Sequence, residues 1–186
     1  DLQGAQLIRT DLLVFPSVDD PAKPFTLLER AAGHTYVVQS GLTGAASGVA
    51  FPNHLAPFIL ETNERELTGD TLVIKFSSTS GEVKLTKTFT LKRGNYAVDV
   101  LHQIENLSAQ AISPSVYLQI TRDGSDPAGT SSAPSFLSGP ANFVGAAIYS
   151  EQEKFQKVTL TEVEKRKASY VKQADNGWFA FVQHYF

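Results

Sequence analysis

The chain has 186 residues, of which 42% are hydrophobic and 19% charged, and its net charge is −3. This composition excludes a largely disordered chain and gives no basic surface for nucleic acid. Because cysteine is absent, disulfides and thiolate metal sites are excluded as well. The length predicts a single domain over residues 1–186. No apolar run reaches the roughly 18 residues of a membrane span, and a start at Asp1 without any methionine predicts a processed or excised segment.

Alternation of apolar and polar residues predicts β-strands along most of the chain. In chain order, the first strands are expected at residues 25–28, 34–39, 58–62 and 71–76. A Gly-rich segment at 41–57 separates the second of these strands from the third, and its first part, 41–48, invites comparison with a phosphate-binding loop. It lacks the Gly-Lys-Ser/Thr ending of such loops and no helical pattern follows it, so a tight exposed loop is favoured.

The clearest predicted unit is a β-hairpin over residues 81–106. Its first strand carries alternating apolar residues, namely Val83, Leu85, Phe89 and Leu91, and its second carries Tyr96, Val98, Val100 and Ile104. The turn at 92–95 contains a glycine that can adopt a positive φ. With Leu91 opposite Tyr96, Leu85 would face His102, and the apolar residues of both strands would share one side of the sheet.

The rest of the chain continues the β pattern with one helical exception. A strand at 116–122 would complete a meander of four strands, and the Gly-, Pro- and Ser-rich loop at 123–142 is of a length that is usually functional or mobile. Further strands are expected at 143–149, 169–173 and 177–186, the last apolar on both faces and therefore covered on both sides. A short helix is expected at 162–168 with Thr161 as its N-cap. The predicted fold is an all-β antiparallel sandwich.

The sequence offers little chemistry. The four histidines (His34, His54, His102 and His184) occupy separate elements, and no pair has the spacing of a zinc site. His102 lies on the inward face of its strand, where a satisfied core histidine is favoured over a general acid or base. Adjacent carboxylates such as Asp19 and Asp20 favour solvated turns. We therefore predict no catalytic, metal or cofactor residues.

Aromatic residues gather toward the end of the chain. Trp178, Phe179 and Phe181 could line a groove, but filling of the core is the favoured interpretation. Binding of a partner is instead expected at five aromatic residues, namely Phe136, Phe143, Tyr149, Tyr185 and Phe186.

Four stretches together resemble a known family. They are QSGLTG (39–44), FTLKRGNYAVDV (89–100), FVGAAIYS followed by EKFQK (143–150 and 153–157) and GWFAFVQHYF (177–186). In this order they resemble the large periplasmic domain of the YidC family, the bacterial inner-membrane protein insertases. The resemblance implies an antiparallel β-supersandwich similar to that of sugar mutarotases. It also implies a location on the periplasmic face of the inner membrane, between the first and second transmembrane helices, with the segment trimmed at both ends.

Three functions follow from these observations. The favoured one is a non-catalytic interaction and scaffold domain of an insertase. Its partners would be Sec translocon components and nascent membrane proteins, and it would be attached to the membrane only through flanking transmembrane helices. The second is a carbohydrate-binding or mutarotase-like enzyme that pairs His102 or His54 with Glu61 or Glu105. The third is a periplasmic chaperone that holds unfolded chains in an apolar groove, for which loss of peptide binding on deletion of the 123–142 loop would be evidence.

Overall fold

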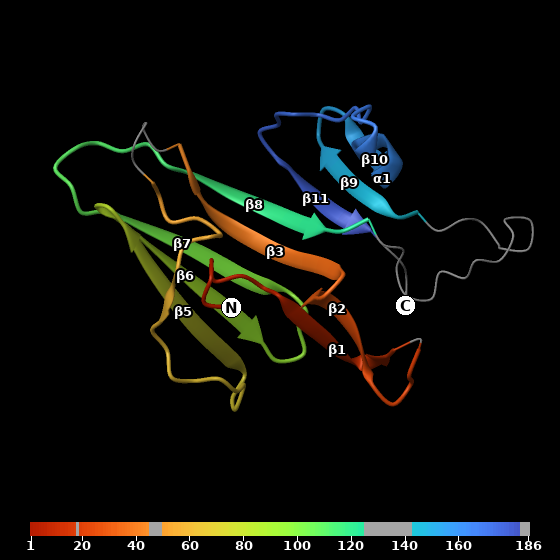
Figure 1. Ribbon diagram of the computed structural model, residues 1–186, viewed down its shortest axis with the longest axis horizontal. Helices are drawn as coiled ribbons and strands as arrows, with labels where there is room; N and C mark the ends of the chain where they lie inside the picture. The colour runs from red at the N-terminus through yellow and green to blue at the C-terminus, as the bar shows by residue number, and fades with distance from the viewer. Residues whose placement is uncertain (18, 45–49, 125–142, 183–186) are drawn as a thin grey trace, which may run out of the picture. The chain divides into compact units, whose positions relative to one another are not determined.

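The computed structural model describes residues 1–17, 19–44, 50–124 and 143–182 (Figure 1). These residues are mostly antiparallel β-strand with one short helix, which confirms the predicted fold class at that level. In chain order the elements are β1 (Arg9–Pro16), β2 (Pro24–Ala31), β3 (His34–Thr43), β4 (Ile59–Leu60), β5 (Thr71–Ser80), β6 (Val83–Lys92), β7 (Val98–Asn106), β8 (Ser115–Arg122), β9 (Gly145–Ser150), β10 (Lys154–Thr159), α1 (Leu160–Glu164) and β11 (Gly177–Val182).

The strands form three sheets, with strand orders β1-β2-β3-β8, β4-β5-β6-β7 and β10-β9-β11. Backbone contacts divide the chain into two compact units, which we describe separately. The first unit comprises Asp1–Thr10 and Leu27–Arg122, and the second comprises Asp11–Thr26 and Asp123–Phe186.

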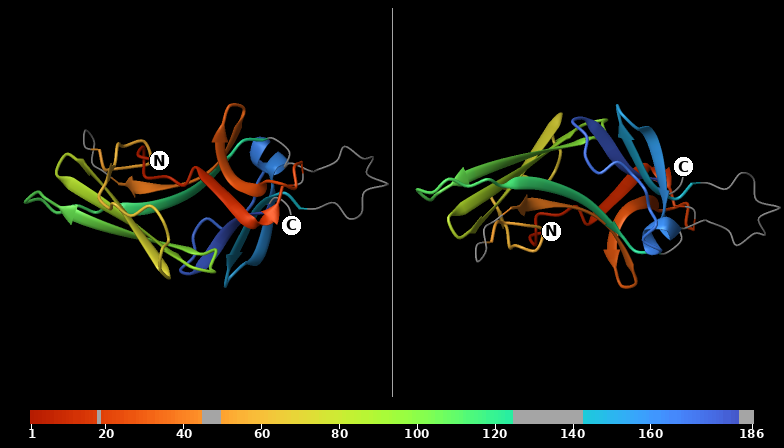
Figure 2. Two further views of the ribbon diagram at one scale, coloured as in Figure 1. Left: turned by 90° about the horizontal axis from the view of Figure 1, so that it is seen from below. Right: turned by 90° about the horizontal axis from the view of Figure 1, so that it is seen from above.

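The core of the first unit lies between the sheet of β6 and the sheet of β3. Buried side chains from both sheets and from the segments beside them pack into one cluster, made of Ala5, Leu42, Phe51, Phe58, Val83, Leu85 and Phe89. Leu85, near the start of β6, is fully buried. The inward residues of β6 are those that the two-residue alternation selects, so this part of the core follows from the sequence pattern. Figure 2 shows β3 running beside β8, and β5 beside β6, in two further views.

The predicted hairpin exists, but its register was wrong by two residues. Leu91 pairs with Val98 rather than Tyr96, and Lys87 rather than Leu85 lies opposite His102. The turn is longer than expected because the backbone N–H of Ala97 donates to the side chain of Asn95 at 2.9 Å, which keeps these residues off the ladder. A shift of two residues preserves which side chains face inward, so the predicted apolar face is confirmed for Val83, Leu85 and Phe89. It was wrong for Tyr96, which lies outside β7 and is 66% exposed.

The predicted four-strand meander was also wrong, because β8 leaves the sheet of β5, β6 and β7. It pairs instead with β3 over eight residues, from Tyr36 opposite Arg122 to Thr43 opposite Ser115. The intervening segment, 107–114, carries the chain from one sheet to the other. Short loops favour pairing of neighbouring strands, and this crossing is an exception to that rule.

In the second unit, β9 is the central strand and pairs antiparallel with both β10 and β11. The sequence pattern missed β1 and β10, and it predicted a strand at 169–173 where the structure has none. The short helix begins at Leu160, two residues before the expected start. Its N-cap is Thr159, which exchanges hydrogen bonds with Glu162 in a capping box. These bonds from Thr159 lower the pKa of the Glu162 carboxyl.

Candidate functional site

A buried lysine lies at the centre of the first unit. Lys87 occupies an inward position of β6 and is fully shielded from solvent. Its Nζ donates to the backbone oxygens of Gly4 and Ser40, both at 2.7 Å, and lies 4.9 Å from the centre of the Phe58 ring. Burial lowers the pKa of Lys87 from its ordinary 10.5 to about 8. The amino group of this β6 residue therefore links two other parts of the chain, the segment before β1 and strand β3.

His102 completes this arrangement from the neighbouring strand. It lies opposite Lys87 in the β6–β7 register, and its Nε2 is 2.8 Å from Oγ of Ser40. Burial, and secondarily the positive charge of Lys87, lowers the pKa of His102 below its ordinary value. The imidazole is therefore neutral at neutral pH, and its Nε2 can accept a hydrogen bond from the Ser40 hydroxyl. We call Lys87, Ser40 and His102 the polar centre.

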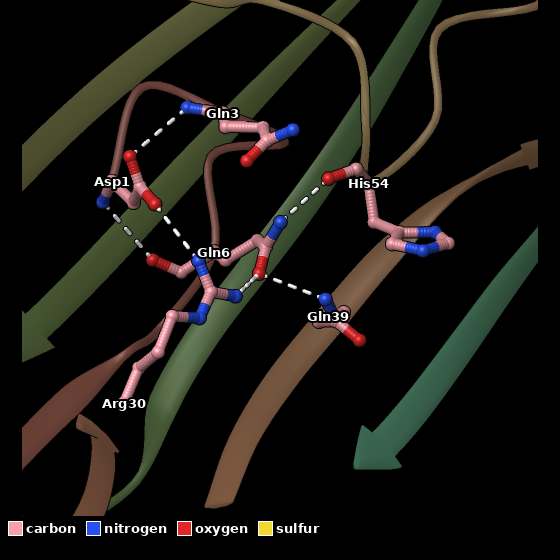
Figure 3. Close-up of polar contacts among 6 residues, drawn as sticks. All are labelled: Asp1, Gln3, Gln6, Arg30, Gln39 and His54. Atoms are coloured by element: carbon pink, nitrogen blue, oxygen red, sulfur yellow. Dashed lines mark hydrogen bonds and ion pairs between the residues drawn. The ribbon is translucent and has the colours of Figure 1, made fainter. Parts of the chain in front are cut away.

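A second network surrounds the side chain of Gln6 (Figure 3). Its Nε2 donates to the backbone oxygen of His54 at 2.5 Å, and its Oε1 accepts hydrogen bonds from Gln39, at 2.8 Å, and from Arg30. Arg30 also forms a 3.1 Å ion pair with the Asp1 side chain. Gln6 and Gln39 are buried, so these bonds satisfy polar groups that have lost contact with water.

The same network extends onto β8 through contacts with three of its residues. Oε1 of Gln39 accepts hydrogen bonds from Gln119, at 2.6 Å, and from Thr121, at 2.9 Å. Nδ1 of His54 lies 2.5 Å from the hydroxyl of Tyr117, and the two rings meet edge to face.

Gly41 permits the close approach of these residues. A Cβ atom at this position would lie 2.6 Å from the Cα of Asn53 and 2.7 Å from the hydroxyl of Tyr117. The glycine at the start of the Gly-rich segment is therefore explained by packing, within strand β3, and not by binding of phosphate.

One candidate acid and base pair of a sugar epimerase, His102 with Glu105, is not brought together. His102 and Glu105 are three positions apart on β7 and therefore point to opposite faces of the sheet. Glu105 faces Lys84 at 3.7 Å, while His54 is bonded to Tyr117. Within residues 1–17, 19–44, 50–124 and 143–182, no group of three His, Cys, Asp or Glu side chains could hold a metal ion.

An apolar cavity of about 240 Å³ adjoins the polar centre in the first unit. It is lined mostly by apolar side chains, including Leu7, Val38, Val100 and Leu118, with Gln39 and Ser40 as its polar lining residues. A cavity of this volume and lining suits a small apolar group rather than a sugar, which would require several converging hydrogen-bonding groups.

Two of the five predicted partner-binding aromatics lie among the described residues. The ring of Phe143 is 5.0 Å from Nζ of Lys157, and Tyr149 stacks on Trp178 with ring centres 5.8 Å apart. Phe136, Tyr185 and Phe186 lie outside the described residues.

The stack of Tyr149 and Trp178 belongs to a row across the whole sheet of the second unit. Tyr149 on β9 lies opposite Phe155 on β10 and opposite Trp178 on β11, and the Phe155 and Trp178 rings are 6.0 Å apart. Phe155 is 52% exposed and Trp178 is 50% exposed. We call these three residues the aromatic row. Because Trp178 and Phe179 are half exposed, the prediction that β11 is covered on both faces was wrong for them.

Sequence reasoning overlooked both Lys87 and Phe155. Lys87 could have been found, because it stands at an inward position between Leu85 and Phe89 in an otherwise regular alternation. A charge at such a position signals a buried polar contact. Phe155 gave no comparable signal, since β10 itself was missed.

Comparison with known proteins identifies the family. The family model described as "YidC periplasmic domain" matches residues 1–186. Two relatives named "Membrane protein insertase YidC" come from Bordetella avium and Bordetella petrii. The first is 55% identical over 98% of this chain and 31% of the relative, and the second is 54% identical over 100% of this chain and 32% of the relative. One from Janthinobacterium sp. is 39% identical over 100% of this chain and 31% of the relative.

The chain thus spans about a third of the length of these relatives. Among the described residues, no helix has the length and apolar character required to cross a membrane. The resemblance expected from the four sequence stretches is confirmed over the full chain, which belongs to the YidC periplasmic domain family.

Proposed function

We propose that this chain is a non-catalytic interaction and scaffold domain of an inner-membrane protein insertase, located on the periplasmic face. Its partners would be Sec translocon components and nascent membrane proteins, and flanking transmembrane helices would attach it to the membrane. Support comes from the full-length family match and from the names of the relatives.

The observation that carries the non-catalytic role is the use of the candidate acid and base groups inside the fold. Lys87 donates to two backbone oxygens, His102 is bonded to Ser40, and His54 is bonded to Tyr117. A general acid or base must be within hydrogen-bond reach of a substrate. Because these side chains are already hydrogen-bonded within the fold, they suit a structural role better than a catalytic one.

We further propose that residues 1–186 form a single domain of the antiparallel β-supersandwich type. Support comes from one family match that covers both compact units and from sheets that are antiparallel in each of them. For contacts with protein partners we propose Phe143 and Tyr149, together with Phe136, Tyr185 and Phe186.

A deletion in the intact insertase tests the scaffold role. In a strain depleted of its own insertase, a stably expressed variant lacking this domain should support growth and membrane insertion largely as the complete protein does. Failure of that variant to support growth would contradict a scaffold role and would assign an essential step to the domain.

Site-specific crosslinking tests the proposed partners. A photoreactive amino acid at position 149 of the intact protein should capture a translocon component or a nascent membrane protein. A matched probe at position 69, in an open loop of the first unit, serves as the control. Capture of the same proteins with equal yield from both positions would contradict a contact at Tyr149.

The mutarotase-like alternative has its own test. The purified chain should show no sugar epimerisation in a coupled assay. Turnover that disappears on the substitution His102→Ala would overturn the proposed role.

A further inference from the structure

The aromatic row is an apolar surface on a rigid support. Its three members come from three hydrogen-bonded strands in direct register, so the sheet fixes their spacing. Tyr149 is partly buried, and the rings of Phe155 and Trp178 are about half exposed. Rings that contact one another yet keep half of their surface in solvent do not serve as a packed core. Such exposed apolar surface commonly marks a contact with a partner.

The charged strand residue on this face is a lysine. The strand residues that share it with the row are Gly145, Ala147, Lys157, Thr159, Ala180 and Val182. Lys157 is the one charged residue among them, and its Nζ lies over the Phe143 ring. No carboxylate stands at any of these strand positions. The wider segment 143–182 carries six basic and five acidic side chains, whereas the whole chain carries a net charge of −3.

Tryptophan, tyrosine and lysine together have a recognised preference for one environment. Trp and Tyr concentrate at the level of lipid head groups, where the ring contacts acyl chains and the polar edge stays hydrated. Lysine extends its aliphatic stem along apolar surface and keeps its ammonium near phosphate. A cation near an anionic membrane surface adds about 1 kcal/mol of attraction.

We propose that the face of the β10-β9-β11 sheet that carries the aromatic row docks on the surface of an anionic phospholipid bilayer. Phe155 and Trp178 enter the head-group region, Tyr149 supports them, and Lys157 pairs with lipid phosphate. This binding is peripheral, since it uses side chains on one face of a sheet and no spanning segment. The proposed function supplies the nearby membrane, but the docking itself is a property of the chain that vesicles can test without any insertase activity.

Trp178 is the only tryptophan of the chain and stands in the row, so it reports on docking directly. The probe is vesicles of phosphatidylethanolamine and phosphatidylglycerol added to the purified 186-residue chain at low salt. Docking should shift the Trp178 emission to shorter wavelength, and brominated phospholipids should quench it. Vesicles of phosphatidylcholine alone should bind a few-fold more weakly, and salt should weaken the binding to anionic vesicles to a similar degree.

Two matched variants locate the contact. Phe155→Ser removes an exposed ring of the row, and we expect vesicle binding to weaken by about tenfold or more. Phe179→Ser is the control, because Phe179 is also 50% exposed but follows Trp178 directly and so points to the opposite face. Phe179→Ser should bind vesicles as the unmodified chain does. Circular dichroism of both variants checks that each remains folded.

Several outcomes would overturn the proposal. They are an unchanged Trp178 emission with anionic vesicles, equal loss of binding in Phe155→Ser and Phe179→Ser, and equal binding to phosphatidylcholine vesicles. A shift that depends on protein concentration without vesicles would assign the row to a second copy of the chain. A crosslink from position 155 to a protein, without vesicle binding, would assign it to a protein partner. None of these results depends on whether deletion of the domain impairs growth.

Discussion

Charged side chains usually lie on the surface of a protein and large aromatic side chains in its core. The polar centre of the first unit and the aromatic row of the second unit are opposite exceptions to this rule. The first places a lysine and a histidine inside a core, and the second places tryptophan and phenylalanine in solvent. Lys87 and His102 find partners within the fold, at 2.7 and 2.8 Å. Phe155 and Trp178 contact each other and Tyr149 but remain half exposed. An unusual residue that is satisfied internally indicates a structural role, whereas one left unsatisfied indicates an external partner.

The strongest test of this comparison is the removal of the buried lysine. In Lys87→Ala, two backbone oxygens lose their donor and a cavity forms in the core. We expect the free energy of unfolding to fall by about 3 kcal/mol. Urea denaturation monitored by circular dichroism measures this change.

Lys84→Ala provides the control on the same strand. Lys84 is partly exposed and faces Glu105 at 3.7 Å, so its loss should cost about 0.5 kcal/mol. If the two lysine substitutions had equal effects, the polar centre would not be a structural element.

A second test concerns the packing that encloses the polar networks. Gly41→Ala should lower the free energy of unfolding by about 1–3 kcal/mol, because the new Cβ would meet Asn53 and Tyr117 at less than 3 Å. Gly69→Ala is the matched control, since no atom lies within 4 Å of a Cβ placed there. Thermal unfolding of both variants measures the difference. A Gly41→Ala protein as stable as the unmodified chain would show that β3 and β8 can move apart without a loss in the free energy of unfolding.

The charge state of the polar centre gives a third test. The pKa of Lys87 is about 8 in the folded chain and 10.5 in its ordinary environment, so the unfolded chain binds more protons between these values. Stability should therefore rise with pH from about 8 to about 10.5, relative to a Lys87→Met variant. Urea denaturation of both proteins across this range measures the difference. A constant difference would mean that the amino group is charged, or neutral, in both states.

The smallest effect is expected for the aromatic row itself. Phe155→Ser should lower the free energy of unfolding by only about 0.5–1 kcal/mol, since a half-exposed cross-strand contact contributes little to folding. Chemical denaturation provides the measurement. A loss as large as that of Lys87→Ala would make Phe155 a core residue and would remove the contrast between the two regions.

Periodicity predicted those parts of the fold in which a strand has one buried and one exposed face. It found the inward face of β6 and β7 because Val83, Leu85 and Phe89 alternate with polar residues. It erred on their register, because the side chain of Asn95 extends the turn in a way that spacing alone does not specify. It missed β10, whose sequence KFQKVT has few apolar residues, and it could not assign β8 to a sheet, since pairing over long separations is set by tertiary contacts.

The candidate sites were less accessible to sequence reasoning than the strands. His102 was correctly placed as an inward histidine, and its favoured interpretation as a satisfied core residue agrees with its bond to Ser40. The partner of that bond lies 62 positions earlier in the chain, and no local pattern connects the two. Aromatic residues near the end were expected to fill a core, and the exposure of Trp178 depends on what packs over β11, which composition does not reveal.

The bonds of Lys87 also bear on the order of folding. Its amino group donates to Gly4, 83 positions away, and to Ser40, 47 positions away, so each bond requires the ends of a long loop to meet. Contacts of such separation slow the search for the native topology and are completed late. Loss of the lysine should therefore accelerate unfolding while leaving the refolding rate nearly unchanged. The amino group would then slow the unfolding of the native structure without guiding its formation.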